Sequence, residues 1–332
     1  MKNVTIQDIA REAKVSKSTV SRVLNDTSAV NPVKRRAVLE ATERLGFKPN
    51  VLAQSLAKGR SMTIGVLTQN IGSPFYDAIS QGLIAGLSGT GYSPIFVDGQ
   101  WREAEEVEAI RALLGRRVDG LILIGGDVPG VELEELCGRV PTVSVARKLS
   151  EGKWPCVFTD NVEGGYRATK YLIGRGHREI AIICGIKQHP DATDRYEGYR
   201  KALEEAGIGL DLGLVLEGDF TADAGVAGIE KLLEGGKRFT AVFAANDMTA
   251  FGARLALFRR GVRVPEDVSL VGFDDQLESA YMAPPLTTVR QPARRMGGEA
   301  VRALMGLIEG GEFESSSFSG ELKERESVAA LG

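Results

Sequence analysis

VTIQDIAREAKVSKSTVSRVLND, residues 4–26, decides the fold at the N-terminal end of this 332-residue chain. Apolar residues recur in it at helical spacing, first over residues 6–13 and again from 17 to about 24. Thr5, with Asp8 three positions later, is typical of a capping box that closes the first turn of a helix. The stretch therefore predicts two short helices joined by a tight link.

A third helix is expected soon after this stretch. Ser16 can cap the second helix, while Asn31 and Pro32 supply a cap and a first-turn proline for a third that ends near Gly46. Two short helices braced by a third make a helix-turn-helix. Residues 1–46 are therefore predicted to be an all-α domain of that kind.

The second helix has the chemistry of a DNA reader on its outer face. In a helix-turn-helix its N-terminal residues enter the major groove, so Lys17 and Ser18 are candidates for sequence selection, and Arg22 can pair with a guanine edge. Short polar side chains nearby suit the phosphate backbone. The expected DNA contacts of the head are Thr5, Ser16, Lys17, Ser18, Thr19, Ser21, Arg22, Asn25 and Asn31. The alternative is a three-helix mini-domain with a solvated basic face.

Net charge conceals an asymmetry between the two parts of the chain. The formal charge is -3, but residues 1–60 hold 12 Lys and Arg against 5 Asp and Glu. The rest of the chain holds 29 basic against 39 acidic residues. A basic head on an acidic body indicates one module that binds a polyanion, although chance clustering would give the same balance.

Composition, at 43% hydrophobic and 26% charged residues, is typical of a soluble globular protein, and the length predicts two or three folding units. No window approaches 18 uncharged apolar residues, so no membrane span is expected. Charges from Asp8 to Glu12 interrupt the region where a secretion signal would need apolar residues, which favours a cytoplasmic protein. Three widely spaced cysteines predict reduced thiols rather than a disulfide or zinc site: Cys137, Cys156 and Cys184.

From Met62 onward, apolar strands alternate with helices. A first series has strands at 63–69, 93–98, 119–126 and 141–146, with helices at 76–90, 102–116 and 131–138. A second has strands at 156–160, 179–185, 214–218, 240–246 and 268–275, with helices near 162–174, 194–206, 222–234 and 248–260. This alternation indicates two α/β lobes with doubly wound parallel sheets. Such sheets bind ligands beyond the carboxyl ends of their strands.

Residues 4–26 resemble the head of the LacI/GalR family of transcriptional regulators, and GFKPNVLAQSLAKGRS, residues 46–61, resembles that family's hinge. The body resembles the family most strongly at 160–185, 243–253 and 270–292. The resemblance implies a body like the sugar-binding periplasmic proteins, with a helix near 293–309 that returns to the first lobe. The expected domains are a head of 1–46, a hinge helix of 47–61, a first lobe of 62–160 and 292–320, and a second lobe of 161–291 and 321–332.

The resemblance also implies a role for the hinge. Asn50 can cap a helix over residues 51–58 that is too short to be stable alone in water. In the family two such helices pair in the DNA minor groove, which implies that Leu56 acts as a wedge between base pairs while Ala53 and Ala57 allow close approach. The alternative is an ordinary linker helix.

The resemblance places a small-molecule effector between the lobes, where polar residues follow the strands. It implies that Arg195 donates several hydrogen bonds to ligand oxygens and that Asp274 accepts from hydroxyls or amines, while Phe220 offers a ring face. The expected effector contacts are Ser73, Phe75, Tyr76, Asp127, Arg147, Asp160, Arg195, Phe220, Asn246 and Asp274. The expected effector is a sugar, a sugar phosphate or, in last place, a purine, and no cofactor or metal is expected.

Three first-lobe segments depart from the family's common pattern and bear on ligand identity rather than on the fold. Gly72 and Ser73 stand where a small residue and asparagine are common, and Ala146 precedes Arg147 where aspartate is frequent. QWREAEE, residues 100–106, replaces a segment that often begins with asparagine and aspartate. The alternative roles of the cleft residues are a surface cation for Arg195, a cap of the next turn for Asp274 and core packing for Phe220.

An enzyme and a transport component are the rival classes. The chain has no G-x-S-x-G, P-loop or complete G-x-G-x-x-G motif, and His177 and His189 are its only histidines. A transport component would fit the body but not the basic head. The sequence therefore favours a repressor that binds a palindromic double-stranded operator as a homodimer under the control of a small polar ligand.

Overall fold

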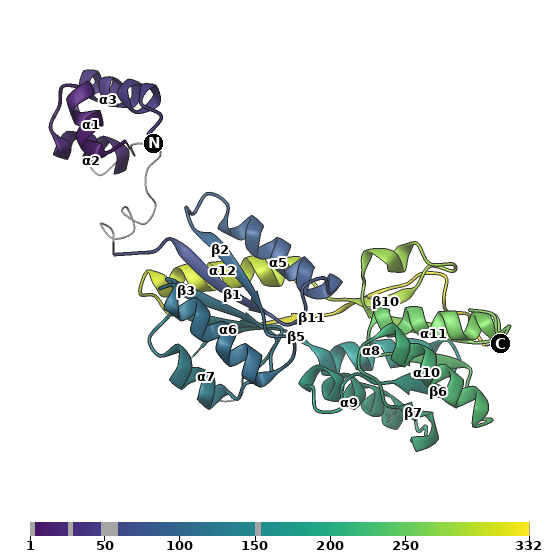
Figure 1. The fold of residues 1–332 in the computed structure, drawn as a ribbon. Coiled ribbons are helices and arrows are strands. Elements are labelled where there is room, and N and C mark those ends of the chain that lie inside the picture. Colours follow the sequence, from purple (N-terminus) through teal and green to yellow (C-terminus); the bar gives the residue numbers. More distant parts are fainter. Residues whose placement is uncertain (1–3, 26–28, 48–58, 150–153, 332) are drawn as a thin grey trace. The chain divides into compact units, whose positions relative to one another are not determined.

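The computed structural model describes residues 4–25, 29–47, 59–149 and 154–331 of the chain. These residues form two compact units (Figure 1). The smaller unit comprises the chain up to residue 63 together with residues 117–119, and the larger comprises 64–116 and the chain from 120 onward. The first contains the head, and the second contains both lobes of the body.

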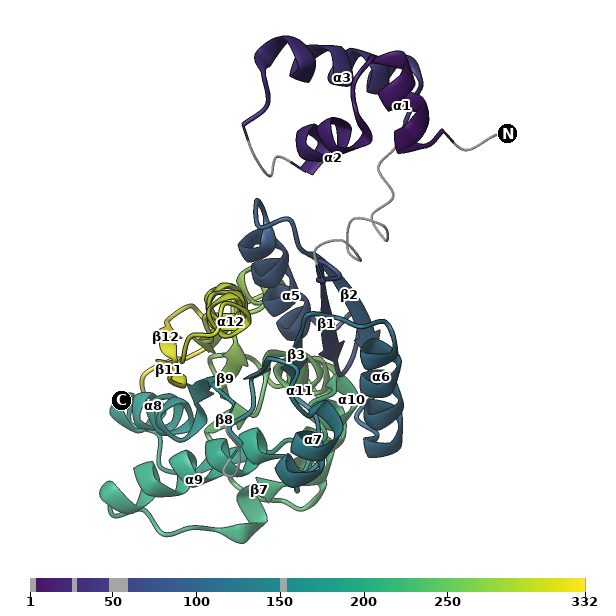
Figure 2. The same ribbon diagram turned by 90° about the vertical axis from the view of Figure 1, so that its left-hand side faces the viewer.

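Three helices make up the described part of the head: α1 (Ile6–Glu12), α2 (Lys17–Asn25) and α3 (Pro32–Arg44) (Figure 2). The predicted capping box is present, because Thr5 and Asp8 bond each other reciprocally. Asn31 Oδ1 accepts the Val33 N–H at 2.9 Å, and Pro32 occupies the first helical position. The predicted helix-turn-helix is confirmed, and its small core consists of Ile9, Ala10, Val20, Val23, Val38 and Ala41.

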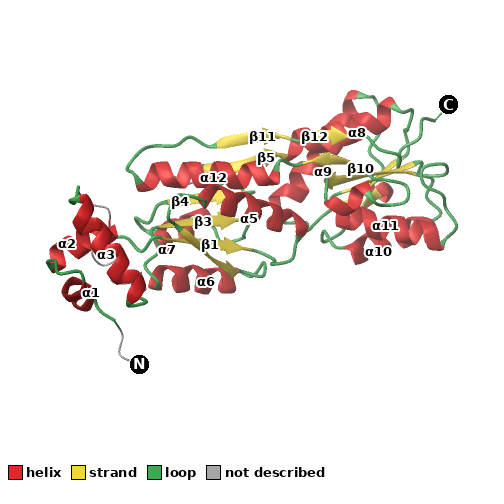
Figure 3. Ribbon diagram, turned by 90° about the horizontal axis from the view of Figure 1, so that it is seen from above, coloured by secondary structure: helices red, strands yellow, loops and turns green. Residues whose placement is uncertain are grey.

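The first lobe is built on a six-stranded sheet in the order β11-β5-β4-β3-β1-β2. Its strands are β1 (Thr63–Thr68), β2 (Ser93–Asp98), β3 (Gly120–Ile124), β4 (Thr142–Val145), β5 (Cys156–Asp160) and β11 (Ser316–Ser319), with parallel pairing from β1 through β3, β4 and β5 to β11. Helices α5 (Pro74–Leu87) and α12 (Ala293–Ile308) cover one face, and α6 (Glu103–Gly115) and α7 (Gly130–Cys137) cover the other (Figures 1 and 3). This is a doubly wound lobe, as predicted.

The second lobe has a six-stranded sheet in the order β12-β10-β9-β8-β6-β7. Its strands are β6 (Ile180–Ile183), β7 (Val215–Leu216), β8 (Ala241–Ala244), β9 (Ser269–Asp274), β10 (Thr287–Arg290) and β12 (Glu321–Lys323). Its helices are α8 (Asn161–Gly174), α9 (Pro190–Glu205), α10 (Ala222–Glu234) and α11 (Asp247–Arg259), packed as the pairs α8 with α9 and α10 with α11, and its 3-10 turns are η1 (Leu212–Leu214) and η2 (Leu277–Ala280). All described pairings are parallel except that of β12 with β10.

The sheets differ from the sequence prediction in four strands. The inner strand β10 was not predicted, and β5, placed in the second series, belongs to the sheet of the first lobe. The edge strands β11 and β12 were not predicted, because SSFS and ELK lack the apolar runs that mark the buried strands. Helix α9 starts at Pro190 rather than near 194, because His189 caps it and the proline takes the first turn. The rest of the predicted fold class is confirmed.

The chain passes between the two sheets three times: after β5, after β10, and between β11 and β12. These passages support the expected division into lobes, whose residue boundaries stay a prediction. Across the described ranges, we find no helix with both the length and the apolar character needed to span a bilayer.

Candidate functional site

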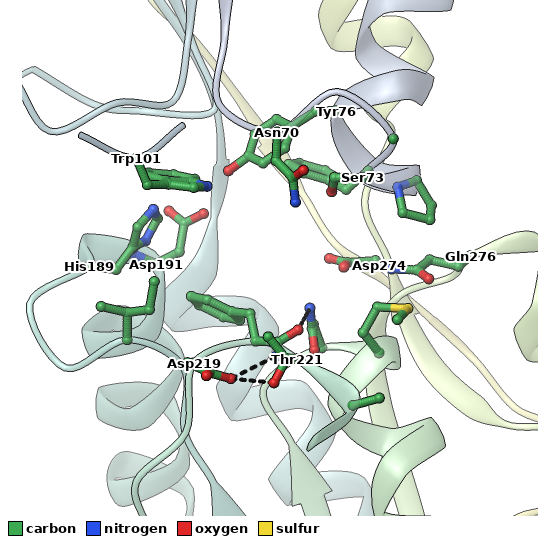
Figure 4. A pocket seen from close by; sticks show the side chains of 18 of the residues that line it. Asn70, Ser73, Tyr76, Trp101, His189, Asp191, Asp219, Thr221, Asp274 and Gln276 are labelled. Atoms are coloured by element: carbon green, nitrogen blue, oxygen red, sulfur yellow. Dashed lines mark hydrogen bonds between the residues drawn. The ribbon is translucent and has the colours of Figure 1, made fainter. Parts of the chain in front are cut away.

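A cavity of about 370 Å³ lies between the two lobes of the body (Figure 4). The structure brings seven of the ten predicted cleft residues to it: Ser73, Phe75, Tyr76, Arg195, Phe220, Asn246 and Asp274. It also brings residues that were not predicted: Asn70, Trp101, His189, Asp191, Asp219, Thr221, Met248 and Gln276. The cavity is thus lined by both lobes, as expected for ligands of doubly wound sheets.

Arg195, on α9, is buried and held by groups of its own lobe. Its Nε donates to Asn161 Oδ1 at 2.9 Å, and its Nη1 donates to the Ala245 carbonyl oxygen at 2.5 Å. Its guanidinium carbon lies 3.8 Å from the centre of the Phe273 ring. At Gly165 of α8 a Cβ would lie 2.2 Å from the Arg195 carbonyl oxygen, so glycine is what lets the two helices approach and seat the arginine.

Two carboxylates, Asp191 and Asp274, face the cavity from opposite sides (Figure 4). They lie 3.8 and 4.0 Å from the guanidinium nitrogens of Arg195. Burial raises the pKa of Asp274 to about 6, although Arg195 and hydrogen bonds from Gln291 and Gln276 act to lower it. Burial likewise raises the pKa of Asp191 against the effect of Arg195. At neutral pH Asp274 is therefore ionised and can accept hydrogen bonds from ligand hydroxyls.

Rings from both lobes form a series along the cavity. The ring centroids are 5.9 Å apart for Tyr76 and Trp101, 4.7 Å for Trp101 and His189, and 5.6 Å for His189 and Phe220. His189 Nδ1 accepts the Asp191 N–H at 3.2 Å and so caps α9. Burial, assisted by the nearby guanidinium, lowers the pKa of His189 to about 4. The imidazole is therefore neutral at neutral pH, as an acceptor must be.

Asn246 and Phe220 have structural duties beside their place in the cavity wall. Asn246 Nδ2 donates to the Phe220 carbonyl oxygen at 3.0 Å, and Asn246 Oδ1 accepts the Thr249 N–H at 2.9 Å to cap α11. Phe220 has a φ of 68°, in the left-handed region. Its ring occupies the space where a Cβ at Gly185 would be, 2.1 Å from the nearest ring atom. The wall is thus fixed by the fold of the second lobe.

Three predicted cleft residues, Asp127, Arg147 and Asp160, are not among those that line the cavity. Asp160 Oδ1 accepts the Glu163 N–H at 2.9 Å and caps α8. The backbone N–H of Asp127 donates to the buried Glu106 carboxylate at 3.0 Å. Burial lowers the pKa of Arg147, while the charges of Glu106 and Asp127 act to raise it. Any role of these three toward an effector stays a prediction.

The sequence contained a signal for two of the residues that were missed. His189, Pro190 and Asp191 are a cap, a first-turn proline and a first-turn acid, which together mark the start of α9 and would have placed both side chains at a strand end. Trp101 belongs to the segment 100–106 that departs from the family pattern, but a single tryptophan has no spacing that could reveal its position.

On the head, Lys17, Ser18 and Arg22 are exposed on α2, where the predicted reading face lies. Ser16 Oγ accepts the Thr19 N–H at 3.2 Å, and the two hydroxyl oxygens are 2.9 Å apart, so this pair serves the start of α2. The predicted contacts Asn50, Ala53, Leu56 and Ala57 and the Asn25 side chain lie outside the described residues. No group of three or more potential metal ligands occurs in the part of the chain that the structure describes.

Comparisons with known proteins agree with both parts of the molecule. The family "Bacterial regulatory proteins, lacI family" matches residues 5–50, and "Periplasmic binding protein-like domain" matches 169–328. Catabolite control protein A of Priestia megaterium is 37% identical over 91% of this chain and 92% of its own length. Among solved structures, a lac repressor dimer bound to operator and the anti-inducer ONPF is 30% identical, covers 99% of this chain and 100% of its own, and has a TM-score of 0.92. A transcriptional regulator CelR–cellobiose complex is 36% identical over 98% and 99%, with a TM-score of 0.75.

A helix-turn-helix head joined to a two-lobed body with a cavity between the lobes defines a DNA-binding regulator with an effector-binding domain. The chain belongs to the LacI family, and it is a transcriptional regulator rather than an enzyme.

Proposed function

We propose that this regulator is a cytoplasmic repressor that binds a near-palindromic operator as a homodimer and is controlled by a sugar or sugar derivative in the cavity. The likeness to a lac repressor dimer bound to operator supports the dimer and the DNA partner. The likeness to a regulator in complex with cellobiose supports a saccharide effector. Two heads of a dimer would meet half-sites about one helical turn apart.

The observation that carries the proposal is the cavity itself. A buried arginine, two carboxylates and several rings converge on about 370 Å³, which suits a small ligand rich in hydroxyl groups. Because both lobes line the cavity, a ligand that touches both stabilises one relative arrangement of the lobes over others. A ~100-fold preference for one arrangement corresponds to about 2.7 kcal/mol of coupling to operator binding.

The test begins with an operator selected from random duplex DNA by the purified protein. Its affinity is then measured by fluorescence anisotropy with and without each of a panel of sugars, sugar phosphates and purines. At least one compound should change the affinity by about tenfold or more. Asp274→Ala should bind the operator as the parent does but lose this response; a variant that keeps the full response would remove Asp274 from the site.

The reading face of the head is tested by the same selection. Lys17→Ala and Ser18→Ala should change the preferred operator sequence, because these residues are exposed at the N-terminal end of α2. Arg44→Ala is the control, since Arg44 ends α3 and pairs with Glu12 at 2.7 Å. The control should keep the operator preference of the parent. An unchanged preference in both Lys17→Ala and Ser18→Ala would refute the assignment of Lys17 and Ser18 as base-reading residues.

A further inference from the structure

The charged side chains that line the cavity are predominantly acidic. Among the described lining residues, Arg195 is the single cation, against three carboxylates. Asp191 and Asp274 lie within 4.0 Å of its guanidinium, and Asp219 accepts hydrogen bonds from Thr221. An anion that enters would lose hydration and meet like charges, which is costly in a partly buried site. Carboxylates that face an open space instead suit ligands that donate hydrogen bonds, and sugar hydroxyls do so.

The single cation is largely engaged within the protein. Arg195 donates to the Asn161 side chain and the Ala245 carbonyl group, and it lies within 4.0 Å of both Asp191 and Asp274. Its guanidinium also stacks on the Phe273 ring. A site for a phosphate ester needs donors that are free to surround the phosphate oxygens. The hydrogen bonds of this arginine go mainly to groups of the second lobe.

Trp101 supplies an aromatic surface from the first lobe. The fully buried Gln69 accepts the backbone N–H of Trp101 through its Oε1 at 3.1 Å. Both Gln100 and Trp101 have positive φ, 55° and 54°, and Phe220 on the facing lobe has 68°. For residues other than glycine such conformations are strained, and they cluster at functional sites. The Trp101 ring faces the cavity (Figure 4), and Phe220 lines it from the other lobe.

We propose that the cavity selects an uncharged saccharide over sugar phosphates and purines, and that Trp101 determines this specificity by covering an apolar face of the sugar ring while the carboxylates accept its hydroxyls. The inference rests on the proposed function, since it names the effector class of the same site.

Matched ligand pairs test the charge preference. Isothermal titration of the full-length protein would compare glucose with glucose 6-phosphate, trehalose with trehalose 6-phosphate, and ribose with ribose 5-phosphate, and would add cellobiose, maltose and hypoxanthine. We expect a neutral sugar to bind at least tenfold more tightly than any phosphate ester or hypoxanthine. A phosphate ester or hypoxanthine that binds more tightly overturns the inference but leaves the proposed function standing. Binding of none of them, with operator binding intact, overturns both.

Fluorescence tests the role of Trp101 without relying on regulation. The chain has two tryptophans, and Trp154 does not line the cavity, so Trp154→Phe leaves Trp101 as the sole indole reporter. The preferred neutral sugar should change the emission of this variant, with an affinity equal to that of the parent. In titration calorimetry Trp101→Ala should lose about tenfold or more in affinity, and Trp101→Phe should recover part of it. Unchanged emission together with parental affinity in Trp101→Ala would overturn the assignment.

Discussion

The second-lobe wall of the cavity consists mainly of polar and charged groups that are bonded within their own lobe, whereas the first-lobe wall presents aromatic rings. Arg195 is fixed by Asn161 and Ala245, and Asp274 by Gln291, all on the second lobe or its edge. Trp101 meets the opposite wall through a ring contact with His189, and Tyr76 packs against Trp101 within the first lobe. The polar wall is therefore held mainly by bonds within the second lobe, while contacts to the aromatic wall depend on how closely the lobes approach.

This difference separates two contributions to ligand binding. The polar wall sets which hydroxyl groups are accepted and in what orientation, because its donors and acceptors are fixed in advance. The aromatic wall adds affinity only in arrangements that bring both lobes to the ligand. Under the proposed function, contacts with Tyr76 and Trp101 are the ones expected to couple ligand occupancy to lobe movement, and hence to DNA binding.

The largest effect should follow from breaking the polar wall at its centre. Arg195→Ala leaves buried carboxylates without their cation and leaves the Asn161 and Ala245 oxygens without a donor. We expect a loss of about 3 kcal/mol in the free energy of unfolding and no ligand-induced thermal shift. Urea denaturation measures the first and differential scanning fluorimetry the second.

The matched control is Arg200→Ala, on the same helix but with a half-exposed side chain paired to Glu197. It should stay within about 0.5 kcal/mol of the parent. Equal destabilisation by both substitutions would show that the second-lobe wall is not held through Arg195.

A second effect should appear as a pH dependence of the polar wall alone. With a pKa of about 6, Asp274 goes from mostly ionised at pH 7 to mostly protonated at pH 5, so affinity for a hydroxyl-donating ligand should fall about tenfold over that range. Stability without ligand changes in the opposite direction. Because the folded-state pKa is raised, this group's contribution is greatest below about pH 4 and is lost as the pH rises to 6.

Calorimetric titrations at pH 7, 6 and 5 would measure this change in affinity. His189, whose pKa is lowered to about 4, stays mostly neutral throughout and should not contribute. Asp191, whose pKa is also raised, contributes in the same direction, so Asp191→Asn should flatten the curve only in part. Asp274→Asn should bind weakly with little pH dependence, and a full parental dependence in that variant would contradict the assignment.

The smallest effect separates the two duties of His189, where the walls meet. His189→Ala removes both the cap of α9 and the ring beside Trp101, whereas His189→Asn keeps a capping side chain. We expect the alanine variant to lose about 1 kcal/mol of stability and the asparagine variant much less. Both should weaken ligand binding by a similar, few-fold factor. Equal stability losses in the two variants would show that the cap contributes nothing.

The two walls also differ in how far the sequence predicts them. Asn246 and Asp274 lie at or near the ends of buried strands, which apolar runs such as that of β9 mark clearly. Arg195, in the second turn of α9, was predicted through the family resemblance. That Trp101 lies beside His189 depends on a contact between residues far apart in the chain, for which no local pattern exists. The cap at His189 was a local signal, but the helix was predicted to start near residue 194 and the cap was therefore missed. The edge strands β11 and β12 lack the apolar pattern altogether.

Three separate chain segments link the lobes, after β5, after β10 and between β11 and β12. A single link would allow rotation in any direction, but three side-by-side links restrict the lobes to bending about one shared axis. We therefore expect chemically different ligands to drive the same motion along the same arc, differing only in how far the equilibrium moves. Under the proposed function, such a body would change its effector through wall residues such as Trp101 while the motion passed on to the DNA-binding head stays the same.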